Sequence, residues 1–152
     1  NENRGLPRKK QGGYGVENYF SMHMEEKEVA AVSALGLAHV GDGVYELLVR
    51  SWICGHGDTT ARNMHRDTVR WVSAPAQAAF VEKILPKLTP EEEALYRRGR
   101  NTRLHGIPKN ASPGEYARAT GLECLFGGLY LMGKTDRLNE LFVSVMEELY
   151  GI

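Results

Sequence analysis

The chain has 152 residues, of which 42% are hydrophobic, and its 19 basic and 19 acidic side chains give a formal net charge of zero. This length predicts one domain, the apolar content is too high for a disordered chain, and no apolar run is long enough to span a membrane. The balanced charge argues against nucleic-acid binding by the whole surface, so a basic patch has to be sought locally.

Residues 1–23 differ from the rest because they carry four glycines, a basic cluster and no helical periodicity. Residues 17–21 resemble a damaged protease-cleavage tag, and His23-Met24 is what a common cloning site leaves before a start codon. We therefore predict a vector-derived, flexible tail over 1–23 and a folded domain over 24–152. The alternative is a natural basic arm.

The pattern after this tail is helical throughout. Apolar residues recur at three- and four-residue spacing over 29–49. Asp58-Thr59 predicts the N-cap of a helix that carries Met64, Val69 and Val72, and Ser73 predicts the cap of another that runs through Leu85.

The second half of the chain shows three more helical segments. Residues 89–92 form a capping box for a helix that ends near Arg100, and 101–112 have the composition of a loop. Residues 112–133 predict a longer helix and 135–149 a last one. Because no strand-like alternation persists, we predict an all-α domain of six or seven helices.

Two cysteines, Cys54 and Cys124, lie in apolar runs without the spacing of a metal site. We predict that both are reduced residues of the core, which favours a cytoplasmic protein.

Two carboxylates interrupt segments that are otherwise apolar. Glu123 lies within residues 122–132, which are apolar on nearly every face, and Asp42 lies between Gly41 and Gly43. A buried carboxylate needs a cation, a metal or a proton, and glycines in mid-helix indicate close approach of another backbone or a ligand.

These acids allow two interpretations. Each could be half of a buried ion pair with an arginine, or the two helices could meet so that both carboxylates share a divalent cation. Glu46 lies one turn after Asp42 and could join them, but Arg50 at i+4 predicts an ordinary surface pair for it. We favour the shared cation, with Asp42 and Glu123 as metal ligands and catalytic residues.

A basic segment follows Tyr96, and no acid occurs from Ala94 to Gly114. The interpretation as a solvated helix end suits its first two arginines, whereas the residues spread over the loop favour phosphate binding. Without interleaved aromatics, contact with the backbone of a duplex is the better match than stacking on single-stranded bases. The predicted RNA-binding residues are Arg97, Arg98, Arg100, Arg103 and Lys109.

Residues 37–46 resemble the signature helix of ribonuclease III catalytic domains, and 120–131 resemble the second metal-binding helix of that family. The match is closer to its short bacterial branch, Mini-ribonuclease III, which lacks a double-stranded RNA-binding domain. Further matching segments are 72–78, 91–101 and 108–110, so the resemblance covers residues 25–149. Longer relatives have carboxylates where this chain has Ala38 and Thr120.

The resemblance implies the ribonuclease III endonuclease fold and Mg²⁺-dependent cleavage of double-stranded RNA, with Mn²⁺ as an alternative ion. It implies 5′-phosphate and 3′-hydroxyl ends, a homodimer with one active site per strand, and maturation of large-subunit (23S) ribosomal RNA. The competing interpretations are a non-catalytic helical module that binds structured RNA, and a helical interaction protein whose acids sit in ion pairs. A pure binder has no use for buried acids at Asp42 and Glu123.

Overall fold

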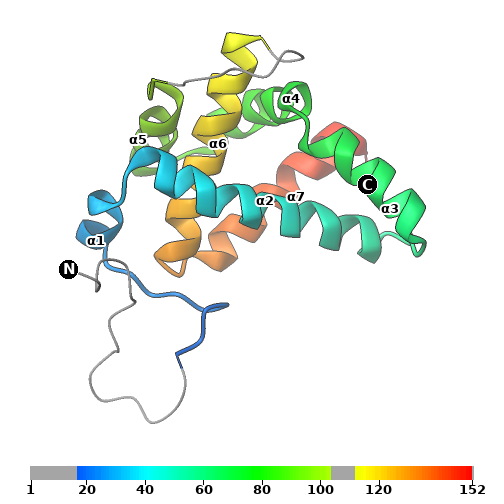
Figure 1. Ribbon diagram of the computed structural model, residues 1–152, viewed down its shortest axis with the longest axis horizontal. Helices are drawn as coiled ribbons and strands as arrows, with labels where there is room; N and C mark the ends of the chain where they lie inside the picture. Colours follow the sequence, from blue (N-terminus) through cyan, green and yellow to red (C-terminus); the bar gives the residue numbers. More distant parts are fainter. Residues whose placement is uncertain (1–16, 104–111, 152) are drawn as a thin grey trace, which may run out of the picture.

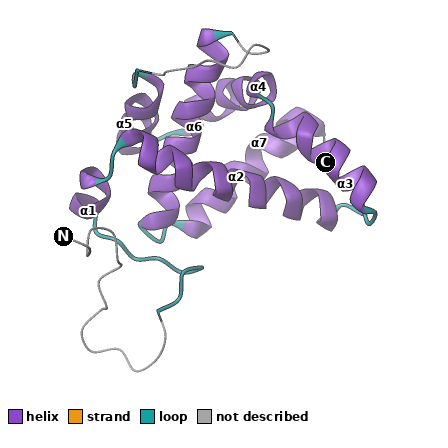
Figure 2. Cartoon of the chain, viewed as in Figure 1, coloured by secondary structure: helices purple, strands orange, loops and turns teal. Residues whose placement is uncertain are grey.

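Two long helices, α2 and α6, cross near the centre of the molecule and carry the most extensive packing (Figure 1). The computed structural model describes residues 17–103 and 112–151. Within these ranges every regular element is helical, and Figure 2 shows no strand, so the predicted all-α fold is confirmed. The elements are α1 (Glu26–Ala31), α2 (Ala34–Gly55), α3 (Ala61–Val72), α4 (Ala74–Ile84), a 3₁₀ turn (Leu85–Lys87), α5 (Pro90–Arg100), α6 (Pro113–Leu131) and α7 (Thr135–Tyr150).

Most helices begin where their capping residues predict. The side chains of Ser73, Thr89 and Ser112 each accept a hydrogen bond from a backbone N–H in the first turn of the helix that follows. Thr89 and Ser112 complete reciprocal capping boxes with the glutamate three residues later. These local hydrogen bonds satisfy donors that the first turn of a helix leaves unpaired.

Two helix boundaries differ from the prediction. The periodic stretch over 29–49 is divided, because Val32 adopts an extended conformation and the Ser33 hydroxyl accepts from the Gly36 N–H at 3.0 Å, which starts α2 anew. The cap of α3 is Thr60 and not the predicted Asp58-Thr59. The three- and four-residue spacing of apolar residues continues through this break, because α1 and the start of α2 both bury apolar side chains in the same cluster.

The core forms around four aromatic rings in contact, Tyr45, Phe80, Phe126 and Phe142, with neighbouring centroids 5.6 to 6.4 Å apart. A smaller cluster packs α1 and the start of α2 against α6, and it includes the buried Cys124. Cys54, predicted in the core, is exposed near the end of α2, where only one side of the helix meets the rest of the protein.

The predicted tail over 1–23 lies mostly outside the described residues. Its last part is described, and there Met22 packs with Met24 against the smaller cluster. The Met24 N–H donates to the Leu131 carbonyl at 2.8 Å, which attaches this segment to the end of α6. In the described part of the chain, no helix is long and apolar enough to cross a membrane.

Candidate active site

The backbones of α2 and α6 are in direct contact where the helices cross. A Cβ added at Gly41 would lie 1.6 Å from the Glu123 carbonyl oxygen, and one added at Gly127 would lie 2.0 Å from the Leu37 carbonyl oxygen. Both distances exclude any side chain, so the crossing requires glycine on each helix. The predicted close approach is therefore observed at Gly41, but Gly43 faces open space, with nothing within 4 Å of an added Cβ.

This contact brings the Asp42 carboxyl next to that of Glu123. Burial raises the pKa of Glu123 to about 8, and the charge of Asp42 and a hydrogen bond between the two carboxyls add to the effect. Two acids in contact cannot both ionise easily, so without a cation the pair retains one proton at neutral pH.

The two acids differ in exposure from what the apolar sequence predicts. Asp42 is exposed and Glu123 is half-buried, so Asp42 is not a buried charge. Asp42 lies between Gly41, which meets the Glu123 backbone, and Gly43, which has open space around it, so it is at the edge of the contact between the helices. Among the described residues neither acid forms an ion pair, which removes the support for the arginine-pair interpretation.

The other candidate ligands are engaged or absent. Glu46 accepts a hydrogen bond from Arg50 at 2.6 Å, as its spacing predicts. Ala38 and Thr120 are buried, and the Thr120 hydroxyl donates to the Tyr116 carbonyl at 3.0 Å. No cluster of three or more potential metal-ligating side chains occurs in the described ranges.

The pair of carboxylates nevertheless fits Mg²⁺. This ion is commonly held by one or two carboxylates, with water and substrate phosphates completing the coordination shell. A hydrogen-bonded pair of acids with a raised pKa supplies two oxygen donors whose mutual repulsion a divalent cation would relieve.

Helix α5 is held against α6 one turn before Glu123. A Cβ at Gly99 would lie 2.6 Å from the Thr120 carbonyl oxygen, and one at Gly121 would lie 2.6 Å from the Tyr96 ring. This second close contact fixes the C-terminal end of α5, and with it Arg97, Arg98 and Arg100 of the predicted basic segment, beside the part of α6 that leads to Glu123.

The structure separates the predicted RNA-binding residues into different groups. Arg97 is paired with Glu93 at 2.6 Å, and Arg98 donates to the Val32 carbonyl at 2.7 Å, which satisfies an acceptor freed by the break between α1 and α2. Arg100 and Arg103 are exposed. Lys109 lies outside the described residues.

One cation near this segment was missed by the sequence analysis. Arg118 is exposed on α6, five residues before Glu123. Its charge and that of Arg100 both oppose the rise that burial produces in the pKa of Tyr96, so both arginines lie near that ring. The sequence carried a signal for this residue, because Arg118 is the one basic residue in α6.

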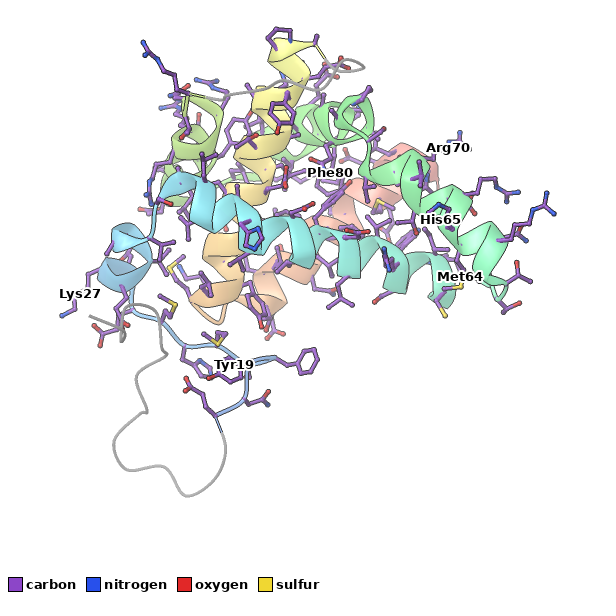
Figure 3. The ribbon with its side chains drawn as sticks, viewed as in Figure 1. Tyr19, Lys27, Met64, His65, Arg70 and Phe80 are labelled. Carbon is purple, nitrogen blue, oxygen red and sulfur yellow. The ribbon has the colours of Figure 1, made fainter. Side chains whose placement is uncertain are left out.

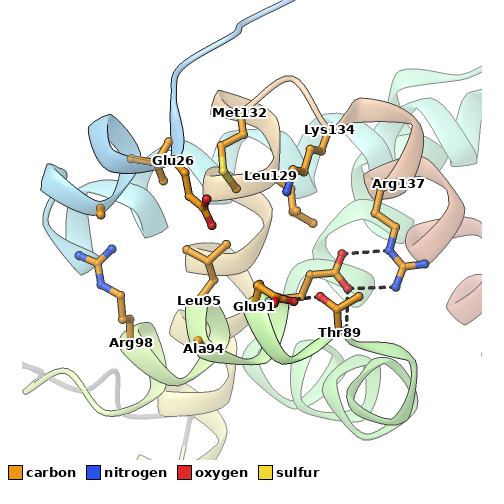
Figure 4. Close-up of a pocket in the computed structure, with 13 residues that line it drawn as sticks. Glu26, Thr89, Glu91, Ala94, Leu95, Arg98, Leu129, Met132, Lys134 and Arg137 are labelled. Atoms are coloured by element: carbon orange, nitrogen blue, oxygen red, sulfur yellow. Dashed lines mark hydrogen bonds and ion pairs between the residues drawn. The ribbon is translucent and has the colours of Figure 1, made fainter.

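A cavity of about 540 Å³ lies between α1, α5 and the ends of α6 and α7 (Figure 4). Its floor is apolar, with Val29, Leu95 and Leu129, and charged residues of both signs line its edge. Neither Asp42 nor Glu123 lines it, so this cavity is separate from the paired acids.

Comparison with known proteins agrees with this arrangement. The ribonuclease III domain matches residues 35–134, which include α2, α6 and both acids. The chain belongs to the ribonuclease III family, and it is an endoribonuclease of the class that acts on double-stranded RNA.

Within this family the chain is similar to short relatives. It is 46% identical to Mini-ribonuclease 3 of Symbiobacterium thermophilum, over 74% of this chain and 87% of the relative. It is 37% identical to Mini-ribonuclease 3 of Clostridium tetani, over 80% of this chain and 81% of the relative. A crystal structure of a Fusobacterium nucleatum protein matches with a TM-score of 0.72 and 26% identity, over 80% of this chain and 97% of that one.

Proposed function

We propose that Asp42 and Glu123 hold Mg²⁺ and form the catalytic centre for hydrolysis of double-stranded RNA, leaving 5′-phosphate and 3′-hydroxyl ends. The observation that carries this proposal is the contact between the two carboxyls, with the pKa of Glu123 raised to about 8. Perturbed acids in contact are typical of functional sites, because a purely structural arrangement would place a cation between them. Mn²⁺ offers similar oxygen coordination and is an alternative.

The residues of the chain contribute position and proton control. The glycine contact at Gly41 fixes the separation of the two acids, so little reorganisation is needed when a cation binds. Binding must release the proton held by Glu123, so affinity for the cation increases as the pH rises toward 8. When bound, the ion supplies an activated water and stabilises charge on the phosphate.

The cations beside α6 position the RNA through its phosphates. Arg100, Arg103 and Arg118 are exposed there, and we assign the same role to Lys109. Arg97 and Arg98 can share it, although their contacts to Glu93 and to the Val32 carbonyl already engage part of each guanidinium. Phosphate contacts set register and orientation without reading sequence.

A homodimer would supply one active site for each strand of a duplex. Two large apolar residues of α2, Leu35 and Leu47, are exposed, with exposed fractions of 47% and 55%. Leu35 lies two turns before Asp42 on the same side of the helix, and Leu47 lies about 120° around the helix from Leu35, at 100° per residue. We assign the exposed surface of α2 to the two-fold interface. Light scattering should give twice the chain mass, and Leu47→Asp should shift the protein to monomer.

We place this activity in the cytoplasm, in the maturation of large-subunit (23S) ribosomal RNA. The similarity to short relatives named Mini-ribonuclease 3 supports this assignment. A precursor transcript of the large-subunit RNA should be cut at discrete positions, whereas degradation without discrete products would contradict it.

Incubation with long duplex RNA, with and without Mg²⁺, tests the central proposal. Cutting should require the ion, and Asp42→Asn should slow it more than about 100-fold, because even the outer partners of metal ligands contribute up to that factor. Glu46→Gln is the matched control, since it removes a nearby carboxylate that is paired with Arg50. If Asp42→Asn cuts at the wild-type rate, the assignment is wrong, and RNA binding without any cutting by the wild type would favour the non-catalytic module.

A further inference from the structure

The cavity between α1, α5 and the ends of α6 and α7 has the size and lining of a small-molecule site. Its volume of about 540 Å³ is within the range of about 300 to 1,000 Å³ that is usual for such sites. Val29, Leu95 and Leu129 form an apolar floor, and the half-buried Met132 adds a polarisable sulfur at one side. The apolar part of a ligand could therefore be removed from water here.

Contacts between the helices fix the walls of this cavity. Leu95 packs on Gly128, where an added Cβ would lie 3.0 Å from the Leu95 Cδ1 atom, so α5 and α6 are in close contact at the floor. Arg98 donates to the Val32 carbonyl at 2.7 Å and joins the end of α1 to α5. The exposed Ala94 lines the edge with only a methyl group, which leaves the cavity open there. A ligand that enters fixed walls loses little affinity to reorganisation of the protein.

The charged side chains around the cavity are balanced, with three of each sign. Glu92 and Arg137 neutralise each other through two hydrogen bonds of 2.9 Å. Within the described residues, four lining side chains form no ion pair, and these are Glu26, Glu91, Arg98 and Lys134. Figure 4 shows the Glu26 and Lys134 side chains pointing toward the middle of the cavity.

This balance decides which kind of ligand fits. A polyanion such as RNA would meet Glu26 and Glu91, and a polycation would meet Lys134 and Arg98, so either would leave two like charges unmatched. A zwitterion supplies a partner for each sign, because its ammonium can donate to a carboxylate while its own carboxylate accepts from Lys134. Charge-assisted hydrogen bonds of this kind are strong, and the apolar floor beside them excludes water.

We propose that this cavity binds a small zwitterion with a large apolar body, of the size and chemistry of an apolar dipeptide. The apolar side chains lie on the floor, the ammonium lies toward Glu26 and Glu91, and the carboxylate lies toward Lys134. Sites of this volume bury ligands of drug size, which a dipeptide with two large side chains matches. Occupation of the cavity does not require the paired acids or a bound cation, since neither Asp42 nor Glu123 lines it.

Calorimetric titration of leucyl-phenylalanine into the full chain tests the proposal. A dissociation constant of about 10 to 100 μM is expected, which is the affinity of a ligand of about 20 non-hydrogen atoms at ordinary efficiency. Three related probes remove one feature each: the N-acetyl form lacks the ammonium, the C-terminal amide lacks the carboxylate, and glycylglycine lacks the apolar side chains. Each should bind at least about 10-fold more weakly, because a hydrogen bond to a charged group contributes about that factor.

Variants of the chain identify which side chains hold the two ends. Glu26→Gln with Glu91→Gln should weaken binding of the dipeptide about 10-fold and leave its N-acetyl form unaffected. Lys134→Gln should weaken the dipeptide and leave its C-terminal amide unaffected. Lys27→Gln is the matched control, because Lys27 is exposed on α1 and points away from the protein (Figure 3).

Ala94→Trp should fill the open edge of the cavity and abolish binding, with thermal unfolding measured to show that the variant is folded. The charge variants test the proposal independently if this variant does not fold. No binding at about 5 mM dipeptide, far above the expected dissociation constant, would overturn the proposal. Equal affinity for the dipeptide and both blocked forms would also overturn it, as would an affinity that the charge variants and the Lys27→Gln control share with the wild type.

Discussion

Glu92 and Glu123 are both carboxylates on helices that pack into the protein, yet their surroundings shift their pKa values in opposite directions. Glu92 lies on α5 and accepts two hydrogen bonds at 2.9 Å from the Arg137 guanidinium, as well as one from the Thr89 N–H (Figure 4). Although burial opposes the effect, these partners lower the pKa of Glu92. Glu123 meets a second acid in place of a cation, and its pKa is raised.

The comparison supports the proposed division between a structural acid at Glu92 and a functional one at Glu123. Around Glu92, the Arg137 guanidinium also donates to the Lys87 carbonyl at 2.8 Å, so the pair is part of a complete hydrogen-bond network. Glu123 has Asp42 beside it and, among the described residues, no cation, and the charge of Asp42 adds to the effect of burial on the pKa of Glu123. Acids that perturb each other in this way, without a cation between them, are typical of functional sites.

The largest effect is expected where the two helices touch. Gly41→Ala places a Cβ 1.6 Å from the Glu123 carbonyl oxygen, so the helices must separate, and we expect a loss of about 3 kcal/mol or more in unfolding free energy and loss of cleavage. Gly43→Ala is the matched control, since its Cβ meets nothing within 4 Å and alanine favours a helix interior by about 1 kcal/mol. Thermal unfolding of both variants checks this, and equal effects would show that the contact does not constrain the crossing.

The second expectation concerns pH in the protein without metal. Because the folded state raises the pKa of Glu123 from 4.5 to about 8, it binds this proton more tightly than the unfolded chain. The resulting stabilisation is complete below the unfolded pKa and is lost as the pH rises through about 8, with a magnitude of about 2 to 3 kcal/mol because solvent screens part of the effect at this half-buried group. Glu123→Gln should remove this dependence, as denaturant unfolding at a series of pH values would show.

For Glu92, the same unfolding experiment should show a dependence of stability on pH that has the opposite sign. Its lowered pKa stabilises the folded state above the unfolded pKa, and that contribution is lost as the pH falls into the acidic range. Glu92→Gln should destabilise the protein by about 1 to 2 kcal/mol at neutral pH, because it leaves Arg137 without its charged partner. Cleavage of RNA should not change. A loss of activity without a loss of stability would contradict the division between these two acids.

The sequence was most informative where a local rule decides the structure. Capping residues such as Thr89 and Ser112 predicted helix starts because their hydrogen bonds reach only three residues along the chain. Acids beside glycines predicted that two helices meet. The break at Ser33 was missed because periodicity continues through it, and Cys54 was placed in the core because composition does not tell which side of α2 is covered.

Other features depend on contacts that are distant in sequence. The exposure of Asp42 could not be predicted, since it follows from how α2 lies over α6. The engagement of Arg98 by the Val32 carbonyl joins residues 66 positions apart, and no spacing rule anticipates it.

The glycine contact between α2 and α6 also has an evolutionary consequence. The distance between the two acids is determined by main-chain atoms, with the Gly41 backbone against the Glu123 carbonyl and Gly127 against that of Leu37. Side chains elsewhere along these helices can therefore be exchanged without altering that distance, provided that the glycines remain. The geometry of the pair can persist through extensive sequence divergence, while the surfaces that surround it adapt to different substrates.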